Sequence, residues 1–223
     1  MSIAQHIARI TAELPEGVRL VAVSKYYPLE ALREAYQAGQ RIFGESRVQE
    51  LCAKREELPA DIEWHFIGHL QSNKIKYIAP FISLIHGVDS EKLLSEIDRQ
   101  AAQAGRTLNC LLQVYIAREE TKFGFSKEEL LAFFESGAWR KLQNIRLCGL
   151  MGMASNTDDE AQIRHEFHNL KILFDTIKSD FQPDNDSFRE LSMGMSGDYP
   201  IAIAEGSTLV RIGTAVFTSQ GDS

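Results

Sequence analysis

The sequence predicts an α/β fold, a single (β/α)8 TIM barrel with an extra helix before the first strand. Eight short apolar segments alternate with helical patterns, and polar and glycine residues gather where those segments end. Alternating strands and helices form parallel βαβ units, and eight such units close into a barrel. We expect one domain over residues 1–223, because no linker or repeat interrupts them. The chain is short against the roughly 250 residues of a typical barrel, and a doubly wound open sheet is the alternative.

The first predicted element is the extra helix near the N-terminus. Ser2 and Gln5 have the spacing of a capping box, in which each side chain bonds the backbone N–H of the other residue. Apolar residues then follow on one helical stripe: Ile3, Ile7, Ile10 and Leu14. No basic segment precedes an apolar core here, so we do not expect a secretory signal.

The predicted strands are short apolar runs. They span residues 18–24, 41–44, 62–68, 84–88, 108–116, 145–151, 189–193 and 208–212. The first run, LVAV before Ser24 and Lys25, is apolar enough for a strand buried on both faces. Pro28 makes it unfavourable for that strand to continue.

Helical patterns lie between the strands. Residues 90–104 carry an apolar face and stop at Gly105, a typical helix terminator. Ser126 and Glu129 have capping-box spacing before a second helix. Residues 160–177 repeat apolar groups every three or four positions, and we expect Thr157 and Glu160 to begin that helix.

Composition and charge exclude several classes of function. The chain has 24 basic and 31 acidic residues, a net charge of −7, which argues against nucleic acid as a partner. No run approaches the roughly 20 apolar residues of a membrane helix, so no membrane partner is expected. The three cysteines fit neither a zinc site nor a disulfide framework, and we expect a cytoplasmic protein.

The last two strand ends resemble a cradle for an anion. Ser196 and Gly197 precede a short helix that we expect Asp198 to cap, and Gly213 and Thr214 follow the eighth strand. Glycines let backbone N–H groups approach a phosphate, and the loops after strands seven and eight are its frequent position in barrels. Turn glycines with satisfied serines are the structural alternative, and the joint location favours phosphate binding.

Lys25, at the end of the first strand, is the candidate for covalent chemistry. A lysine at a strand end is commonly only solvated, but facing a phosphate cradle it suggests a Schiff base. Two ligands would suit, a phosphorylated sugar aldehyde or pyridoxal 5′-phosphate (PLP). Beside a pyridine nitrogen, the permanent cation of Arg211 would disfavour ring protonation and weaken the electron-sink action of PLP.

Other candidates have simpler explanations. His65 and His69 are four apart on a strand and are not expected to meet, and His165 and His168 are expected on a solvated helix face. We predict no metal site. The aromatic residues are expected in the core: Trp64, Phe66, Phe123, Phe125 and Trp139.

Several motifs together resemble one known family. They are VAVSK with Pro28, FGE with VQEL, WHFIGHLQSNK, GLM, LSMGMSGDY and GSTLVRIGTAVF, and they extend from Val18 to Phe217. On these the chain is identified as a member of the YggS/PROSC group of PLP homeostasis proteins, which look like the barrel domain of alanine racemase (PLP fold type III).

The resemblance implies a cofactor site and a role. Lys25 would carry PLP as a Schiff base and Arg211 would lie at the pyridine nitrogen. The phosphate would be held by Ser196, Gly213 and Thr214, with Met195 nearby. The family is regarded as buffering or delivering PLP without established turnover, often as monomers, so PLP-dependent apo-enzymes are expected partners and no catalytic residue is assigned.

Two other functions stay open at this stage. An amino-acid racemase would need a second base across the cofactor, for which Tyr26, Tyr27 and Tyr199 are candidates. A Schiff-base aldolase acting on a phosphorylated sugar is the third hypothesis. The chain also departs from the family pattern, with Ser46 and Arg47 where an asparagine and an aromatic residue are usual.

Overall fold

Eight parallel strands form one closed barrel in the computed structural model, which describes residues 1–118, 123–182 and 184–218. The strands pair in chain order, and the last pairs back with the first. They are β1 Arg19–Val23, β2 Ile42–Glu45, β3 Glu63–Phe66, β4 Leu84–Val88, β5 Leu108–Val114, β6 Ile145–Gly152, β7 Glu190–Ser192 and β8 Leu209–Ile212. The predicted barrel is confirmed, and the open sheet is wrong because β1 and β8 leave no free edge.

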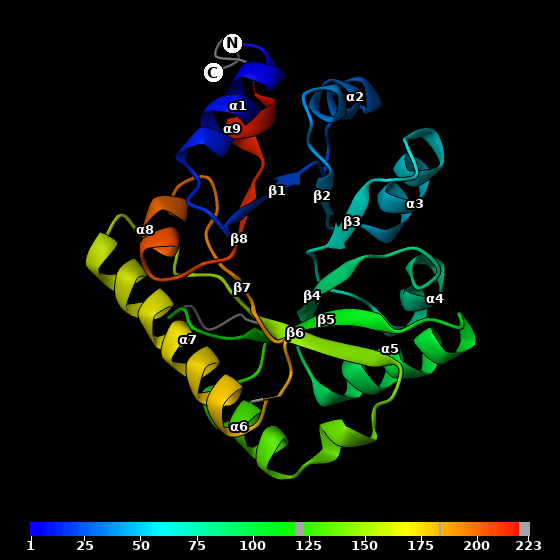
Figure 1. Ribbon diagram of the computed structural model, residues 1–223, viewed down its shortest axis with the longest axis vertical. Coiled ribbons are helices and arrows are strands. Elements are labelled where there is room, and N and C mark those ends of the chain that lie inside the picture. Colours follow the sequence, from blue (N-terminus) through cyan, green and yellow to red (C-terminus); the bar gives the residue numbers. More distant parts are fainter. Residues whose placement is uncertain (119–122, 183, 219–223) are drawn as a thin grey trace.

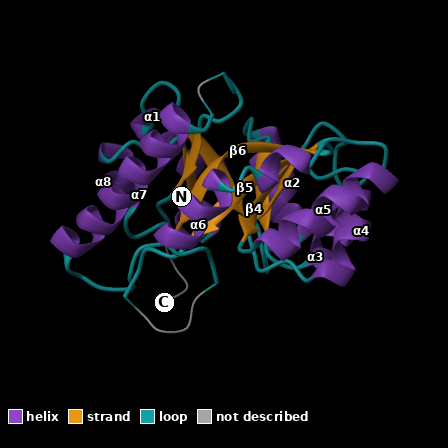
Figure 2. Cartoon of the chain, turned by 90° about the horizontal axis from the view of Figure 1, so that it is seen from below, coloured by secondary structure: helices purple, strands orange, loops and turns teal. Residues whose placement is uncertain are grey.

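Helices surround the strands on the outside of the barrel (Figures 1 and 2). The α-helices are α1 Ile3–Glu13, α2 Leu29–Gln37, α3 Val48–Glu57, α4 Ile75–Ile78, α5 Glu91–Gln103, α6 Lys127–Glu135, α7 Glu160–Asp180, α8 Tyr199–Ala204 and α9 Thr214–Phe217. Two short 3-10 helices are η1 Ser72–Lys74 and η2 Ala138–Lys141. The extra helix α1 lies against α9, so the first and last described helices are neighbours (Figure 1).

Both predicted capping boxes form, whereas the predicted start of α7 differs. The capping boxes lie at Ser2 before α1 and at Ser126 before α6. Helix α7 was expected to begin at Thr157, but its N-cap is Asp159, whose carboxylate accepts hydrogen bonds from the N–H groups of Ala161 and Gln162. The hydroxyl of Thr157 instead accepts from the N–H of Asp159, so it supports the cap rather than forming it.

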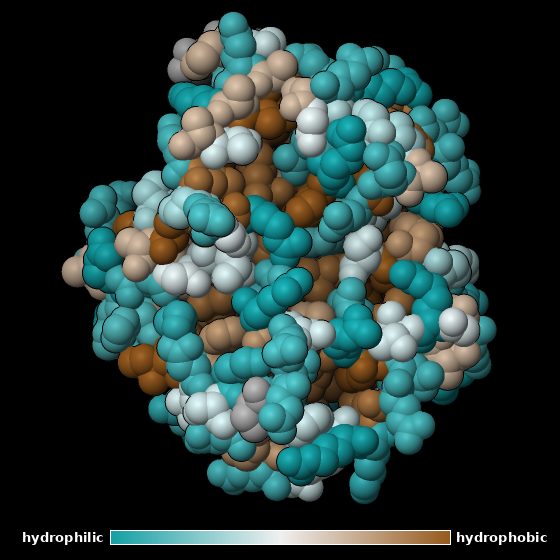
Figure 3. Space-filling view, in the orientation of Figure 1, coloured by the Kyte–Doolittle hydropathy of each residue, from teal (hydrophilic) through white to brown (hydrophobic). Residues whose placement is uncertain are grey.

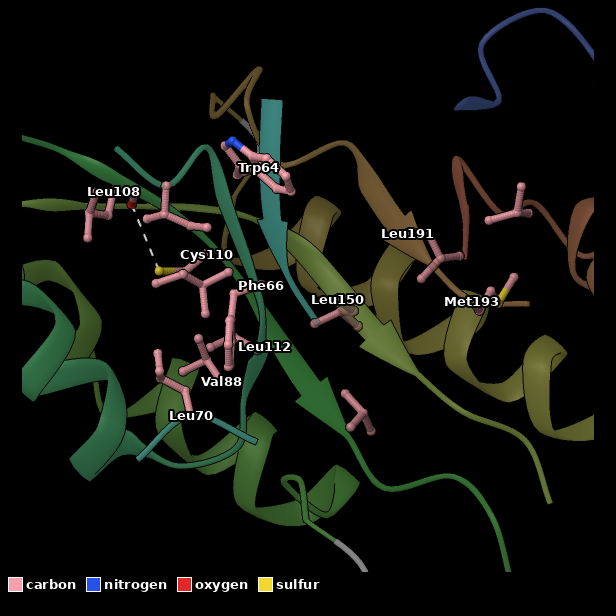
Figure 4. Close-up of a cluster of buried hydrophobic side chains, with 14 of the residues drawn as sticks. Trp64, Phe66, Leu70, Val88, Leu108, Cys110, Leu112, Leu150, Leu191 and Met193 are labelled. Atoms are coloured by element: carbon pink, nitrogen blue, oxygen red, sulfur yellow. Dashed lines mark hydrogen bonds between the residues drawn. The ribbon is translucent and has the colours of Figure 1, made fainter. Parts of the chain in front are cut away.

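The main hydrophobic core lies between the strands and the surrounding helices. Its largest fully buried side chains include Phe43, Phe66, Phe134, Phe167 and Phe188. Figure 4 shows part of this layer, with Trp64 and Phe66 on β3, Val88 on β4 and Leu112 on β5. Burying one such side chain stabilises the fold by roughly 1.5–3 kcal/mol, so this layer is the main source of stability.

A second, smaller cluster fills the inside of the barrel. It contains Val21, Ile42, Leu84, Leu111, Cys148, Met151 and Leu209. Cys148 belongs to this inner cluster whereas Cys110, on the adjacent strand, belongs to the outer one, and both thiols are free. The two cysteines therefore lie on opposite faces of the sheet.

The surface is mostly hydrophilic, with hydrophobic residues showing near the centre of the face seen in Figure 3. One aromatic prediction is wrong: Phe123 is 58% exposed and stacks on the imidazole of His69 instead of entering the core. Trp64, Phe66 and Phe125 are buried as predicted, and Trp139 packs against the core while partly exposed. Across the described residues, no helix is long and apolar enough to cross a membrane.

We predict that Gly149→Ala will be strongly destabilising. Gly149 has φ of 145°, and a Cβ there would stand 1.8 Å from the carbonyl oxygen of Glu190 on the neighbouring strand. Relief requires β6 and β7 to separate, and we expect a loss of about 3 kcal/mol or more in urea unfolding. Gly105→Ala is the control, because its φ is also positive but its Cβ would meet no atom, so about 1 kcal/mol is expected. Equal losses in the two variants would contradict this account.

Candidate functional site

Lys25 is presented by a tight turn at the carboxyl end of β1. The N–H of Tyr27 donates to the carbonyl of Ser24 at 3.1 Å, which closes the turn around Lys25 and Tyr26. Tyr26 has φ of 69°, a left-handed conformation that favours glycine. Pro28 then stands at the N-cap of α2 and separates the turn from the helix. The strand ends at Val23, as the proline predicts.

A buried ion pair fixes both neighbours of Lys25. The ammonium of Lys54 lies 2.7 Å from a carboxylate oxygen of Glu45 and donates to the carbonyl of Ser24 at 2.7 Å. Lys54 also pairs with Glu50 at 2.7 Å, and that carboxylate accepts from the N–H of Tyr26 at 2.7 Å. These bonds hold the strained backbone of Tyr26 in place.

Burial and hydrogen bonding shift the pKa values of the two carboxylates in the cluster formed by Glu45, Glu50 and Lys54. Burial raises the pKa of Glu45, although the hydrogen bonds from Lys54 and Ser24 work in the opposite direction. Burial also acts to raise the pKa of Glu50, but hydrogen bonds from Lys54 and the Tyr26 amide outweigh it and leave that pKa lowered. Removing one partner from such a pair would leave a buried charge without a counter-charge, which is strongly unfavourable. The cluster therefore supports the turn around Lys25 rigidly.

The Lys25 side chain itself is half-buried and has no hydrogen bond or ion pair with any described residue. Its ammonium lies 5.9 Å from the ring centroid of Tyr26, and the guanidinium of Arg47 lies 5.0 Å from the same ring. Arg47, a departure from the family pattern, therefore contacts the exposed Tyr26 by a cation–π interaction. Tyr27 has a different role, since it stacks on Phe217 and its hydroxyl bonds Thr218.

The predicted anion cradle presents unbonded backbone donors. Ser196 and Gly197 follow β7 on an exposed loop, and their N–H groups have no backbone acceptor among the described residues. Gly213 is the N-cap of α9 and Thr214 its first residue, so the N–H groups there lack helical partners. A Cβ on Gly197 would meet open space, whereas Gly213 lies against the carbonyl of Val23. The two segments therefore offer N–H donors beside the end of β1.

Asp198 does not cap α8 in the predicted way. It occupies the N-cap position, but its side chain makes no capping bond to the helix. Its carboxylate accepts instead from the N–H of Met195 at 2.6 Å, which pins the loop that carries Ser196. Met195 is exposed at this loop. Asp198 therefore shapes the cradle rather than the helix.

Arg211 lies inside the barrel, where its two terminal guanidinium nitrogens each donate a hydrogen bond. It donates to the hydroxyl of Ser192 at 2.5 Å and to the carbonyl of Gly152 at 3.1 Å. Burial lowers its pKa to about 10, and the nearby carboxylate of Asp198 opposes that shift. At neutral pH Arg211 therefore remains a cation, held in a fixed orientation.

A chain of hydrogen bonds extends from Arg211 through Ser192 to two buried histidines in the barrel interior. Ser192 bonds Nδ1 of His86 at 2.9 Å, and Nε2 of His86 bonds Nδ1 of His65 at 2.9 Å. Burial lowers the pKa of His65 to about 3, and the charge of Arg19 adds to this effect. Burial and the charges of His65, Arg211 and Arg19 hold the pKa of His86 well below its usual value. Both imidazoles are therefore neutral at pH 7.

Lys25, Arg211 and the cradle segments stay predicted site residues, and the buried polar groups around them were not predicted from the sequence. His86 and Ser192 lie in apolar strands, and the one available signal was a polar residue inside such a run. The other histidines behave as predicted, since His69 is separate from His65 and bonds Asp89, and His165 and His168 are exposed. Within the described ranges no group of three His, Cys, Asp or Glu residues could hold a metal ion.

Comparison with known proteins agrees with this geometry. Residues 1–220 match the family model described as alanine racemase, N-terminal domain. The pyridoxal phosphate homeostasis protein of Vibrio alginolyticus is 41% identical over 231 residues, 97% of each chain. The chain belongs to this family. A homeostasis protein of Helicobacter pylori is 43% identical over 204 residues, covering 90% of this chain and 87% of the relative.

Solved structures extend the comparison. PipY of Synechococcus elongatus PCC7942, a structure with PLP bound, is 40% identical with a TM-score of 0.89, covering 97% of this chain and all of PipY. Alanine racemase from E. faecalis shares the fold at 16% identity and a TM-score of 0.72, but this chain covers only 57% of it. Members of the homeostasis-protein family thus match this chain over its length, whereas the racemase has a large additional part.

We predict that acid will destabilise the barrel through its neutral histidines. The unfolded chain protonates His65 near pH 6.5, but the native pKa is about 3, so the unfolded state binds the extra proton between these values. The contribution of His65 to the free energy of unfolding is then fully present above pH 6.5 and is lost as pH is lowered. At pH 4 the loss from His65 alone is about 3 kcal/mol. Urea unfolding measured at intervals from pH 7 to pH 4 gives the slope of the free energy of unfolding against pH.

The matched variants are His65→Gln and His69→Gln. The first removes the buried titrating group and is expected to flatten the slope between pH 6.5 and pH 4. The second removes an exposed histidine and is expected to leave it unchanged. An equal slope in wild type and His65→Gln would show that His65 is not the source.

Proposed function

We propose that this protein holds PLP as a Schiff base on Lys25 and serves intracellular PLP homeostasis as a buffer or carrier. The observation that carries the proposal is the half-buried Lys25 at the carboxyl end of β1, whose ammonium has no hydrogen bond or ion pair with a described residue and lies beside free backbone N–H donors. The names of the curated relatives and the PLP-bound PipY structure support it.

The residues present suit each part of such a cofactor. The donors near Ser196, Gly213 and Thr214 suit a phosphate, because backbone N–H groups and hydroxyls bind its oxygens. The lysine supplies the amine that an aldehyde condenses with. Arg211 supplies a cation for a ring nitrogen, and Met195 lies at the edge of the cradle. These elements all come from one chain, and we propose that the protein acts as a monomer in the cytoplasm.

The Arg211 cation favours binding of PLP over catalysis with it. When bound, PLP supplies an electrophilic carbon and a ring that withdraws electrons best when its nitrogen is protonated. The Arg211 cation opposes a proton on a nitrogen beside it, because two positive charges would then be adjacent. Ser192 and the Gly152 carbonyl keep the guanidinium in that orientation. A binding site of this kind retains a cofactor with little support for turnover, and we propose PLP-dependent apo-enzymes as recipients.

We predict that borohydride will trap pyridoxyl on Lys25. Purified protein supplied with PLP is expected to absorb in the visible range, to lose that band on reduction, and to show the added mass on the peptide that contains Lys25. Lys25→Ala is expected to abolish both signals while leaving the unfolding transition in place. A colourless protein that stays unlabelled, or a label on another lysine, would contradict the proposal.

The control is Lys141→Ala, which removes an exposed lysine on η2, four residues before β6 begins and so at the opposite barrel end from Lys25. It is expected to keep both the absorbance and the label on Lys25. Loss of labelling in this control would mean that the signal does not report a specific site.

We further predict that no sustained amino-acid racemisation will be measured. The hydroxyls of two candidate second bases are engaged elsewhere, Tyr199 with Glu13 at 2.6 Å and Tyr27 with Thr218 at 3.2 Å. Tyr26 is left, at 68% exposure beside Lys25. A chiral assay with PLP-loaded protein and L-alanine is the measurement, with Tyr26→Phe as the variant. Turnover that disappears in both Tyr26→Phe and Lys25→Ala would establish the racemase alternative.

A further inference from the structure

A polar cavity of about 390 Å³ opens at the end of the barrel opposite Lys25. Its lining residues lie at or just before the starts of the strands, such as Arg19 on β1 and Arg146 on β6. We call it the basal cavity. It shares no residue with the cradle or with Lys25, so the proposed function does not use it.

Positive charge predominates in the basal cavity. Four arginines line it, with two glutamates: Arg19, Arg106, Arg146, Arg189, Glu63 and Glu190. Glu190 is already neutralised, since Arg19 lies 2.6 Å from one carboxylate oxygen and the Thr208 hydroxyl donates to the other at 2.9 Å. Arg106 is also occupied, because it donates to the carbonyls of Ala79 and Ile82.

Two guanidinium groups are left largely free to bind a ligand. Among the described residues, the Arg146 guanidinium has one hydrogen bond, a long one of 3.4 Å to Asn109, and Arg189 lies 3.6 Å from Glu190 with a side chain that is 76% exposed. Arginine forks match the oxygens of carboxylates and phosphates. In a chain with a net charge of −7, such a group of cations is a local anion site rather than part of a basic surface.

His65 forms the floor of the basal cavity and is only 3% exposed. Its Nδ1 bonds His86, whereas its Nε2 has no hydrogen-bond partner among the described residues. This nitrogen is therefore open to the cavity, where a ligand or solvent group can complete its hydrogen bonding.

The hydrogen-bond chain determines what that nitrogen offers. Arg211 can only donate, so Ser192 accepts from it and directs its own proton to Nδ1 of His86. Neutral His86 then donates from Nε2 to Nδ1 of His65, and neutral His65 must carry its proton on Nε2. In this assignment the proton on Nε2 of His65 is the one without an acceptor among the described residues, and it is presented to the basal cavity as an N–H donor.

We propose that the basal cavity binds a small metabolite carrying two anionic groups, held by Arg146, Arg189 and the Nε2–H of His65. Its volume lies within the range of small-molecule sites and exceeds what a single ion needs. The shared chemistry is an oxyanion, supplied by either phosphate or carboxylate groups. The ligand would contact His65, at the opposite end of the hydrogen-bonded chain from Arg211.

Titration calorimetry tests the proposal with two probes, inorganic pyrophosphate for phosphate groups and succinate for carboxylates. The protein is loaded with PLP and reduced with borohydride, so that the cradle is filled, and sodium chloride keeps the ionic strength constant. We expect at least one probe to bind in the millimolar range or tighter, and the tighter one identifies the source of the anion. Absence of binding by both at 10-fold higher concentrations would overturn the proposal.

The variants Arg146→Gln and Arg189→Gln are each expected to weaken that probe about tenfold, since each removes a charged hydrogen-bond donor. Arg33→Gln, an exposed arginine on α2, is the control and is expected to change nothing. Unchanged affinity in both basal variants would overturn the proposal. These variants lie at the opposite barrel end from Lys25, so their result is independent of whether Lys25 carries PLP.

His65 is tested with a pair of variants. His65→Gln keeps an N–H donor and is expected to retain most of the affinity, whereas His65→Leu removes the donor and is expected to weaken binding about tenfold. Equal affinity in the two would show that His65 does not bind the ligand. The surface arginine variants keep the proposal testable if His65→Leu does not fold.

Discussion

The pairing of β1 with β8 is the contact on which both ends of this barrel depend. Its register aligns Arg19 with Leu209 and Val21 with Arg211, so the first and last strands run side by side. At the carboxyl end this places Lys25 near Gly213, which lies against the carbonyl of Val23. At the other end it places Arg19 within reach of Glu190 on β7. Without closure, the residues that bear the proposed site would lie at opposite edges of a sheet.

Buried polar groups give the barrel interior its specific arrangement. Apolar residues fill most of the inside, but His65, His86, Ser192 and Arg211 form a continuous hydrogen-bonded chain among them. Each of these groups would be costly to bury alone, and each is satisfied by the next. The histidines remain neutral, so Arg211 is the one charged member of the chain. This arrangement fixes the orientation of the Arg211 guanidinium and connects it to the basal cavity through His65.

The rigidity around Lys25 has a separate source. Lys54 and Glu45 form a buried ion pair whose remaining bonds reach the backbone carbonyl of Ser24, while Glu50 holds the N–H of Tyr26. The turn is thereby kept in a conformation that tyrosine adopts only at a cost. The backbone on both sides of Lys25 is held in place, while its amine has no hydrogen bond to any residue that the structure describes, which suits the proposed attachment of a cofactor.

The sequence by itself determined the fold and the places where chemistry could occur. Apolar runs and caps specify strands and helices locally, so seven residues of strand β5 or the capping box at Ser126 could be read from short windows. Strand ends identified Lys25 and the cradle because parallel barrels gather their functional groups there.

Only the tertiary structure decided which polar residues meet. Nothing in a single window pairs Glu45 with Lys54 or His65 with His86, or brings Arg146 and Arg189 to one cavity, since these arrangements depend on how the strands close and which face each residue takes. The same is true of Phe123, whose apolar character suggested the core although it stacks on His69 at the surface. Local patterns report propensity and burial, whereas hydrogen-bond partners are set by long-range register.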